Sequence, residues 1–264
     1  MRIGLIGGGK MAEALISGML AKTVCTVDDL LVSDLDPGRR QRLHGQYGVE
    51  TLEQNRTVAE RSDVVILAVK PQHLDPVLAE LAPVAVGRLF VSIAAGRRLS
   101  TFEQRLPGAR VVRVMPNLPF QAGEGMSVFC RGVDATEADV RLVRQILESG
   151  GRVLEMDESF FDFVTALSGS APAFFAFVVQ AFVKTAGAYG MASDTALQLA
   201  LQTMRGTAAI MMQDGISPAE LMVNVASKGG TTAAGLAVLE NSDVSAVLQA
   251  TLDAAARRSA ELSA

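Results

Sequence analysis

The chain has 264 residues, of which 49% are hydrophobic, and 24 Lys and Arg against 28 Asp and Glu give a net charge of −4. This length is enough for one large or two modest domains with a substantial core, and the acidic balance argues against a protein that coats nucleic acid. Two cysteines without a CxxC pair exclude a disulfide scaffold and favour a reducing cytoplasm, where we expect this protein. Two histidines are too few for a histidine-based zinc enzyme, and we predict no metal site.

Strand-like and helix-like segments alternate over residues 1–157. Short apolar runs rich in β-branched residues lie at 3–6, 30–33, 64–69, 89–93 and 111–115. Helix-compatible segments, such as 11–22 and 38–44, lie between these runs. Continuous apolar runs are typical of parallel strands buried on both faces, and their alternation with helices indicates βαβ units. We therefore predict an α/β domain over 1–157, a doubly wound sheet of the Rossmann type.

From residue 158 onward the strand signal is absent and helical patterns dominate, so we predict an all-α domain over 158–264. Ser217-Pro218-Ala219-Glu220 is a capping box with proline at the first helical position, and another helix is expected to open at Asp243. Residues 160–188 are apolar on nearly every side, interrupted by Ser168-Gly169-Ser170. We expect a buried helix here rather than a membrane span, because the most apolar part, 171–183, is short and contains a proline.

The apolar stretch also predicts self-association, because a small helical domain offers it limited cover. We expect a dimer whose interface includes seven phenylalanines. These are Phe160, Phe161, Phe163, Phe174, Phe175, Phe177 and Phe182.

A glycine motif directly follows the first predicted strand and opens a helix. Gly7-Gly8-Gly9-Lys10-Met11-Ala12 matches G-x-G-x-x-A. In this motif Gly7 permits a tight turn, Gly9 allows a pyrophosphate to approach the backbone, and Ala12 allows close helix–sheet packing. Because a helix N-terminus attracts phosphate, we predict dinucleotide binding at Gly7, Gly9, Lys10 and Met11.

The end of the second strand should read the adenosine ribose of that dinucleotide. Asp34 can accept hydrogen bonds from a free 2′-hydroxyl, which favours NAD, and it would repel a 2′-phosphate. Ser33 is a candidate phosphate contact, and Arg39 and Arg40 follow within reach of a loop. Each arginine is equally well explained as a surface charge, so the choice between NAD and NADP stays open.

Other motifs follow the remaining strands and occupy the helical half. They are Ile66-Leu67-Ala68-Val69-Lys70-Pro71-Gln72, Ser92-Ile93-Ala94-Ala95-Gly96, Arg113-Val114-Met115-Pro116-Asn117, Leu167-Ser168-Gly169-Ser170-Ala171-Pro172-Ala173 and Ser227-Lys228-Gly229-Gly230-Thr231-Thr232-Ala233-Ala234-Gly235-Leu236. In this order they resemble the Δ1-pyrroline-5-carboxylate reductase family over essentially the whole chain. Ala171 and Lys228 depart mildly from the family pattern, which often has glycine and proline there. Asp34-Leu35 stands where relatives that prefer NADPH tend to carry Asn-Arg.

The resemblance implies an NAD(P)H-dependent imine reductase that makes L-proline, the last step of proline biosynthesis. It implies NADP(H), with NAD(H) as the alternative, and a homo-oligomer of dimers. The cofactor residues implied in addition to the glycine motif are Ser33, Asp34, Asn55, Ala68, Val69, Lys70, Pro71 and Ala94. The substrate residues implied are Ser170, Gly229, Gly230, Thr231 and Thr232, with Thr232 as the catalytic residue. No membrane or nucleic-acid partner is expected.

The chemistry fits the composition, because an iminium substrate is itself the electrophile and needs no strong protein base. Several residues keep a structural alternative. Gly229-Gly230 could be a helix C-cap and Thr231 or Thr232 an N-cap. Ser168-Gly169-Ser170 could be a helix break, Lys70 a solvated loop residue and Asn55 a helix cap, and we expect His73 to be a surface residue.

Two other functions share this layout. A β-hydroxy-acid dehydrogenase would need a lysine on its long helix, and this chain has none between Phe161 and Val183. A non-catalytic, nucleotide-sensing paralogue is disfavoured because the segment Gly229–Thr232 is intact.

Overall fold

The computed structural model describes residues 1–263, and the chain forms two compact units. The first unit contains Met1–Ser170 together with the last part of the chain from Ala254. The second unit is Ala171–Asp253. The second unit is thus inserted, in sequence, into the first.

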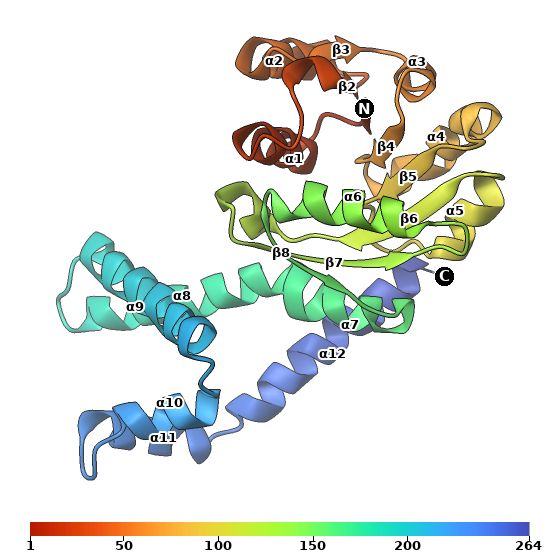
Figure 1. Ribbon diagram of the computed structural model, residues 1–264. Helices are drawn as coiled ribbons and strands as arrows, with labels where there is room; N and C mark the ends of the chain where they lie inside the picture. The colour runs from red at the N-terminus through yellow and green to blue at the C-terminus, as the bar shows by residue number, and fades with distance from the viewer. Residues whose placement is uncertain (264) are drawn as a thin grey trace. The chain divides into compact units, whose positions relative to one another are not determined.

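The first unit is built on one eight-stranded sheet with the order β3-β2-β1-β4-β5-β6-β7-β8 (Figure 1). The strands are β1 Ile3–Ile6, β2 Leu30–Ser33, β3 Glu50–Leu52, β4 Val64–Leu67, β5 Leu89–Ser92, β6 Arg110–Met115, β7 Gly125–Arg131 and β8 Gly151–Glu155. Strands β1 to β6 run parallel, β7 pairs antiparallel with β6, and β8 is parallel to β7. The predicted Rossmann-type sheet is confirmed.

Helices cover both faces of the sheet. Alternate residues of each strand point to opposite faces, so each face has its own set of buried side chains. Helices α1 (Lys10–Ala21), α2 (Pro37–Tyr47) and α6 (Glu137–Glu148) pack on one face, where Leu5 and Val91 are buried. Helices α3 (Asn55–Glu60), α4 (Leu74–Leu81), α5 (Leu99–Arg105) and α7 (Phe161–Val164) pack on the other, where Leu67 and Phe90 are buried. Burial on both sides explains why the strands read as unbroken apolar runs.

The end of the last helix completes the first unit. Ser259 Oγ donates to Asp162 Oδ1 at 2.7 Å. Gly96 has φ +66°, and a Cβ placed on it would lie 2.8 Å from the Cβ of Leu262. Residues 96 and 262 therefore meet so closely that only a glycine fits in the loop after β5.

The second unit consists of helices alone. They are α8 (Ala171–Ala188), α9 (Ser193–Asp214), α10 (Pro218–Val225), α11 (Thr231–Glu240) and the first part of α12 (Val244–Ser263). The predicted capping box is confirmed, since Ser217 Oγ accepts from the Glu220 N–H at 3.2 Å and Glu220 accepts from the Ser217 N–H at 2.7 Å. Helices α8 and α9 pack side by side and leave between them a groove of about 750 Å³.

The apolar stretch 160–188 is helical throughout, and much of its surface is exposed within a single chain. At Ser168-Gly169-Ser170 the α-helix is interrupted by a π-helical turn, Thr165–Ser170, and α8 begins directly after it. Phe175, Phe177 and Phe182 are 59%, 71% and 62% exposed, which agrees with the expectation that a single chain gives this helix limited cover. Phe161 is instead fully buried in the first unit, against the sheet, so it belongs to the core and not to an interface.

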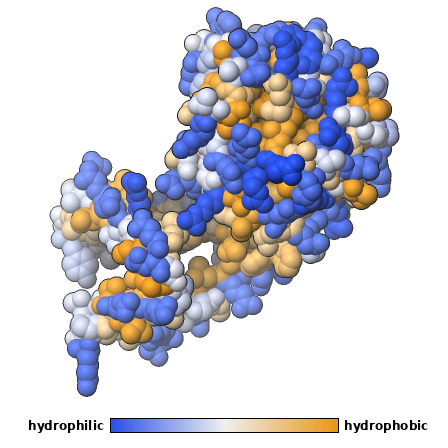
Figure 2. All heavy atoms as spheres, viewed as in Figure 1, coloured by the Kyte–Doolittle hydropathy of each residue, from blue (hydrophilic) through white to orange (hydrophobic). Residues whose placement is uncertain are grey.

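One helical stretch in residues 1–263, Glu158–Ala188, is long and apolar enough to cross a membrane by length and composition alone. Core helices of soluble proteins have the same property. Apolar side chains also reach the surface over α10 and α11, where Val223 is 74% and Val238 is 70% exposed (Figure 2). The second unit therefore presents much more apolar surface than the first.

Candidate functional site

The glycine turn after β1 is held against the neighbouring strands. Gly7 has φ +99°, and its N–H donates to the carbonyl of Ser33 at 2.8 Å. A Cβ on Gly7 would lie 3.0 Å from the carbonyl oxygen of Ala68 and 3.1 Å from a methyl group of Val69. Both the backbone angle and the lack of space therefore require glycine at this position.

The N-terminus of α1 is open beside this turn. Gly9 is the N-cap residue and makes no side-chain capping bond, and a Cβ placed on it would meet no atom within 4 Å. The N–H groups at the start of the helix, those of Lys10 and Met11 among them, therefore have no protein cap. An uncapped helix N-terminus behind a glycine turn is the arrangement that binds a pyrophosphate in Rossmann-type folds.

The Asp34 carboxylate accepts hydrogen bonds from the glycine turn and from its own loop. One oxygen accepts from the Gly8 N–H at 2.8 Å, and the other accepts from the Asp36 N–H at 2.9 Å. The Arg39 guanidinium lies 3.5 Å from the oxygen that Gly8 binds. The Asp34 side chain is only 10% exposed, so these contacts fix a negative charge beside the turn.

Arg40 points away from this charge. Its guanidinium donates to the carbonyl oxygens of Asp34 and Leu35 at 2.6 and 3.1 Å and lies 3.6 Å from Glu53. Of the two arginines, Arg39 is thus the one whose side chain, 54% exposed, has the freedom to meet a ligand at Asp34.

The other predicted cofactor residues follow the ends of neighbouring parallel strands. The Ala68 N–H donates to the carbonyl of Ile6, which brings the end of β4 beside the glycine turn. Lys70 is exposed and precedes a short 3-10 turn, Pro71–His73, in which His73 is exposed as expected. Ala94 is buried, and its N–H donates to Ser92 Oγ at 3.3 Å. The strand order reverses between β1 and β4, and in doubly wound folds ligands bind at the carboxyl ends of the strands at such a point.

Asn117 ties the end of β6 to the π-helical turn. Its amide nitrogen donates to Ser168 Oγ at 3.2 Å, and its oxygen accepts from the Met126 N–H at 2.9 Å. A Cβ on Gly169 would lie 2.4 Å from the Met115 methyl group. Ser170, a predicted substrate residue, therefore belongs to a turn that packs at the carboxyl end of β6. Sequence reasoning missed this contact, although the motif that contains Asn117 marks the strand end.

The segment Gly229–Thr232 lies in the second unit, between α10 and α11. Gly229 has φ +73°, and Gly230 is the N-cap residue of α11 without a side-chain capping bond. Thr231 and Thr232 are the first two residues of the helix, so the interpretation of either threonine as an N-cap is wrong. The interpretation of Gly229-Gly230 as a C-cap is also wrong, because α10 ends at Val225 and its C-cap residue is Ala226. The helix N-terminus is left open to an anion.

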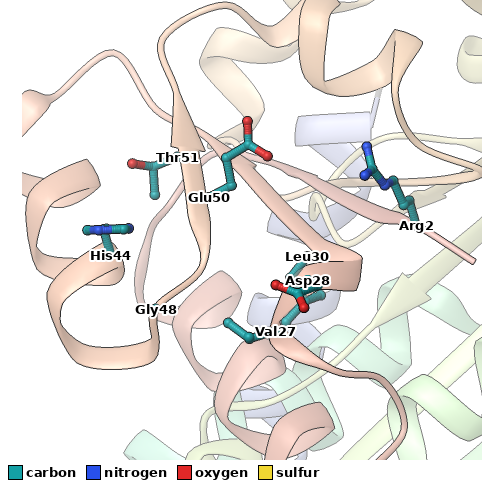
Figure 3. Close-up of a pocket in the computed structure, with 8 residues that line it drawn as sticks. All are labelled: Arg2, Val27, Asp28, Leu30, His44, Gly48, Glu50 and Thr51. Carbon is teal, nitrogen blue, oxygen red and sulfur yellow. The ribbon is translucent and has the colours of Figure 1, made fainter.

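A separate cavity of about 600 Å³ lies at the opposite edge of the sheet (Figure 3). It is lined by residues at the amino ends of β1, β2 and β3, among them Arg2, Leu30 and Glu50. None of the predicted site residues lines it. Within residues 1–263, no cluster of three His, Cys, Asp or Glu side chains could hold a metal ion.

Comparisons with known proteins agree with this geometry. Residues 158–262 match the family model for pyrroline-5-carboxylate reductase dimerisation, and residues 2–96 match the model for NADP oxidoreductase, coenzyme F420-dependent. The chain is 37% identical to a pyrroline-5-carboxylate reductase of Glycine max, covering 99% of this chain and 96% of that protein.

Two solved structures share the fold over its whole length. A pyrroline-5-carboxylate reductase from Coxiella burnetii has a TM-score of 0.94 at 30% identity and covers 100% of this chain and 98% of its own. Pyrroline carboxylate reductase of Plasmodium falciparum, solved with NADP bound, has a TM-score of 0.90 at 25% identity with the same coverage. The match to a dimerisation domain confirms that the helical half serves self-association. This chain belongs to the pyrroline-5-carboxylate reductase family.

Proposed function

We propose that this protein reduces the C=N bond of Δ1-pyrroline-5-carboxylate to give L-proline, with NADP(H) as the cofactor. The observation that carries the proposal is the presence, in a chain of this family, of two uncapped helix N-termini behind glycine turns. One, at Gly9, is suited to a pyrophosphate, and the other, at Gly230, is suited to a carboxylate. When bound, the reduced nicotinamide supplies the hydride.

The residues around the glycine turn fit a dinucleotide. Gly7 and Gly9 leave the backbone bare where a Cβ would otherwise stand, and no side chain caps the N-terminus of α1. Asp34, just after β2, and Asn55, at the start of α3, would hold the adenosine ribose, and the buried Ser33 would support Asn55 through its hydroxyl. Ala68, Val69, Lys70, Pro71 and Ala94 would contact the rest of the dinucleotide just after the ends of β4 and β5.

The substrate would be held by its carboxylate on the open N-terminus of α11. The N–H groups of Thr231 and Thr232 are donors that no protein side chain caps, and the Thr232 hydroxyl would donate to the ring nitrogen or the carboxylate. Ser170, the remaining substrate residue that the sequence predicts, lies in the first unit. The chain then needs only to bind and orient the substrate, because a protonated imine accepts hydride without a strong protein base.

A second copy of the chain would cover the apolar surface of the helical unit. The groove between α8 and α9 is lined by apolar side chains such as Phe175, Phe182 and Met204. Exposed aromatic surface of this extent favours a protein interface. We propose a dimer, and an assembly of dimers beyond it, with neither membrane nor nucleic acid as partner.

Residues 1–157 would act as the dinucleotide-binding domain, and 158–264 as the substrate-binding and dimerisation domain. The family match that begins at residue 158 supports this functional boundary. We further propose a cytoplasmic location, which two free thiols, Cys25 and Cys130, support.

Initial rates test the proposed activity. Purified protein is mixed with pyrroline-5-carboxylate and either NADPH or NADH, and the loss of absorbance of the reduced nicotinamide is followed. We expect turnover that depends on the substrate, with proline as the product. Mixtures without pyrroline-5-carboxylate are the control. Oxidation of neither cofactor, in a sample that binds NADPH, would favour the non-catalytic paralogue instead.

A further inference from the structure

A carboxylate on α4 holds the side chain of Asn55. Glu80 lies in the last turn of α4, and its Oε2 accepts from Asn55 Nδ2 at 2.8 Å. Its Oε1 accepts from the backbone N–H of Arg56 at 3.1 Å. The residue before α3, Gln54, makes no side-chain capping bond. Glu80 therefore supplies, from another helix, the acceptor that the N-terminus of α3 lacks.

These contacts determine which way the Asn55 carboxamide faces. A carboxylate only accepts hydrogen bonds, so the amide nitrogen must face Glu80. The amide oxygen then faces Ser33, whose Oγ donates to it at 2.8 Å. Ser33 is fully buried, so its hydroxyl proton is committed to this bond. One N–H of Asn55 and one lone pair of its oxygen are left for a ligand.

Ser33 connects this pair to the glycine turn. Its carbonyl accepts the N–H of Gly7 at 2.8 Å, while its hydroxyl holds Asn55. Ser33 thus connects Asn55 to the phosphate-binding turn, and the Asn55 side chain is held beside the end of β2. In doubly wound folds this position receives the adenosine ribose. A spare amide hydrogen and a spare amide oxygen suit the two hydroxyls of a ribose, or one hydroxyl and a 2′-phosphate.

We propose that Glu80 is a positioning residue for the dinucleotide. It holds the Asn55 carboxamide in the single orientation that presents its spare donor and acceptor to the ribose, and it acts through Asn55 without touching the cofactor. This inference rests on the proposed function, because it requires NADP(H) at the glycine turn.

The substitution Glu80→Gln tests the orientation with little change of shape. A glutamine amide can face Asn55 with its own nitrogen, and Asn55 is then free to turn over, with its nitrogen towards the Ser33 hydroxyl. Losing one oriented hydrogen bond should raise the Kd of NADPH about 5- to 20-fold. The Kd is measured from the change in nicotinamide fluorescence on binding. Glu60→Gln is the matched control, because the Glu60 carboxylate pairs with Arg56 at 2.8 Å on the far end of α3.

A double-mutant cycle separates positioning from general destabilisation. In the background of Asn55→Ala, Glu80→Gln should change the Kd less than about 2-fold, because the residue through which it acts is gone. The same fold-change in Kd in both backgrounds, or an unchanged Kd in Glu80→Gln, would overturn the inference. A wild-type protein that does not bind NADPH would refute the proposed function instead.

A second variant covers the case in which Glu80→Gln does not fold. Glu80→Asp keeps the charge and withdraws the carboxylate by one methylene, and it should raise the Kd by a similar factor. A wild-type Kd for Glu80→Asp, with a wild-type melting temperature, would also overturn the inference.

Discussion

The substitution Asp34→Asn tests how the charge beside the glycine turn selects the cofactor. In the structure the two carboxylate oxygens accept from the N–H groups of Gly8 and Asp36 at 2.8 and 2.9 Å. An asparagine keeps one of these bonds and turns its own N–H₂ towards the other donor. Leaving one N–H unpaired costs about 1–3 kcal/mol when the group is buried. Because Arg39 and solvent reach the site, we expect a loss of stability near 1 kcal/mol.

The change in cofactor preference should be larger than the change in stability. A 2′-phosphate about 5 Å from the Asp34 carboxylate would be repelled by roughly 1–3 kcal/mol, at an effective dielectric constant between 20 and 80. Arg39, 3.5 Å from the carboxylate, reduces this repulsion and becomes free to pair with the phosphate in the variant. We therefore expect wild-type protein to accept both cofactors, and Asp34→Asn to shift the ratio of kcat/KM for NADPH over NADH about 10-fold towards NADPH.

The assay measures kcat/KM for each cofactor at saturating pyrroline-5-carboxylate, together with a thermal melt. Asp36→Asn is the matched control, because it removes a charge in the same loop, where Asp36 caps α2 through the Gly38 N–H and lies 3.7 Å from Arg39. An unchanged ratio in Asp34→Asn would refute the role of Asp34 as the reader of the 2′ position. The same shift in Asp36→Asn would show that the effect comes from net charge alone.

Three further predictions follow from the helical unit and the buried thiol. Thr232→Ala should lower kcat/KM for pyrroline-5-carboxylate roughly 10- to 100-fold by removing one hydroxyl hydrogen bond. Its melting temperature should stay that of the wild type, because Gly230 and not Thr232 is the N-cap; wild-type kinetics with a lowered melting temperature would contradict the substrate role. Phe177→Asp should weaken self-association, which is measured by light scattering at micromolar concentration. A wild-type protein that scatters as a 27.8 kDa monomer would refute the interface. Burial raises the pKa of the Cys130 thiol to about 12. The folded state therefore keeps a proton that the unfolded state loses above pH ~8.5. Between these two pH values the free energy of unfolding should fall by up to about 1.4 kcal/mol per pH unit. Urea unfolding at pH 8 and pH 10 should show this loss in the wild type and not in Cys130→Ala.

The strands that the sequence predicts well are those buried on both faces. The runs at 3–6 and 30–33 coincide with β1 and β2, and those at 64–69, 89–93 and 111–115 agree with β4, β5 and β6 to within two residues. Strand β3 has only three residues, of which Glu50 is exposed and Thr51 and Leu52 are partly buried, so it has no continuous apolar run. Strands β7 and β8 were also missed, since glycines begin both and β8 carries exposed residues such as Arg152 and Glu155.

The candidate site was predictable where a motif dictates backbone geometry. The motif alone predicts a tight turn at Gly7, and its φ of +99° agrees with that prediction, whereas Gly9 has an extended backbone and no atom near its Cβ position. The partners of Asn55 could not be found from the sequence, because Glu80 lies 25 residues away and contacts it only through the fold. The same holds for Asn117 and Ser168, which are 51 residues apart. Whether Thr232 caps a helix depends on where α11 begins, and a shift of two residues would make it the N-cap.

The order in which the chain is made has a consequence for how the first unit matures. Asp162 and Gly96 receive Ser259 and Leu262, residues that are synthesised after the whole helical unit. A nascent chain can form the eight-stranded sheet early, yet the surface under α12 stays uncovered until residues 254–263 emerge from the ribosome. The final turns of α12 are therefore the last part of the first unit that can fold into place. A shortened chain that ends before Ser259 should keep the sheet, expose the loop after β5, and be cleaved there by a protease that spares the full-length protein.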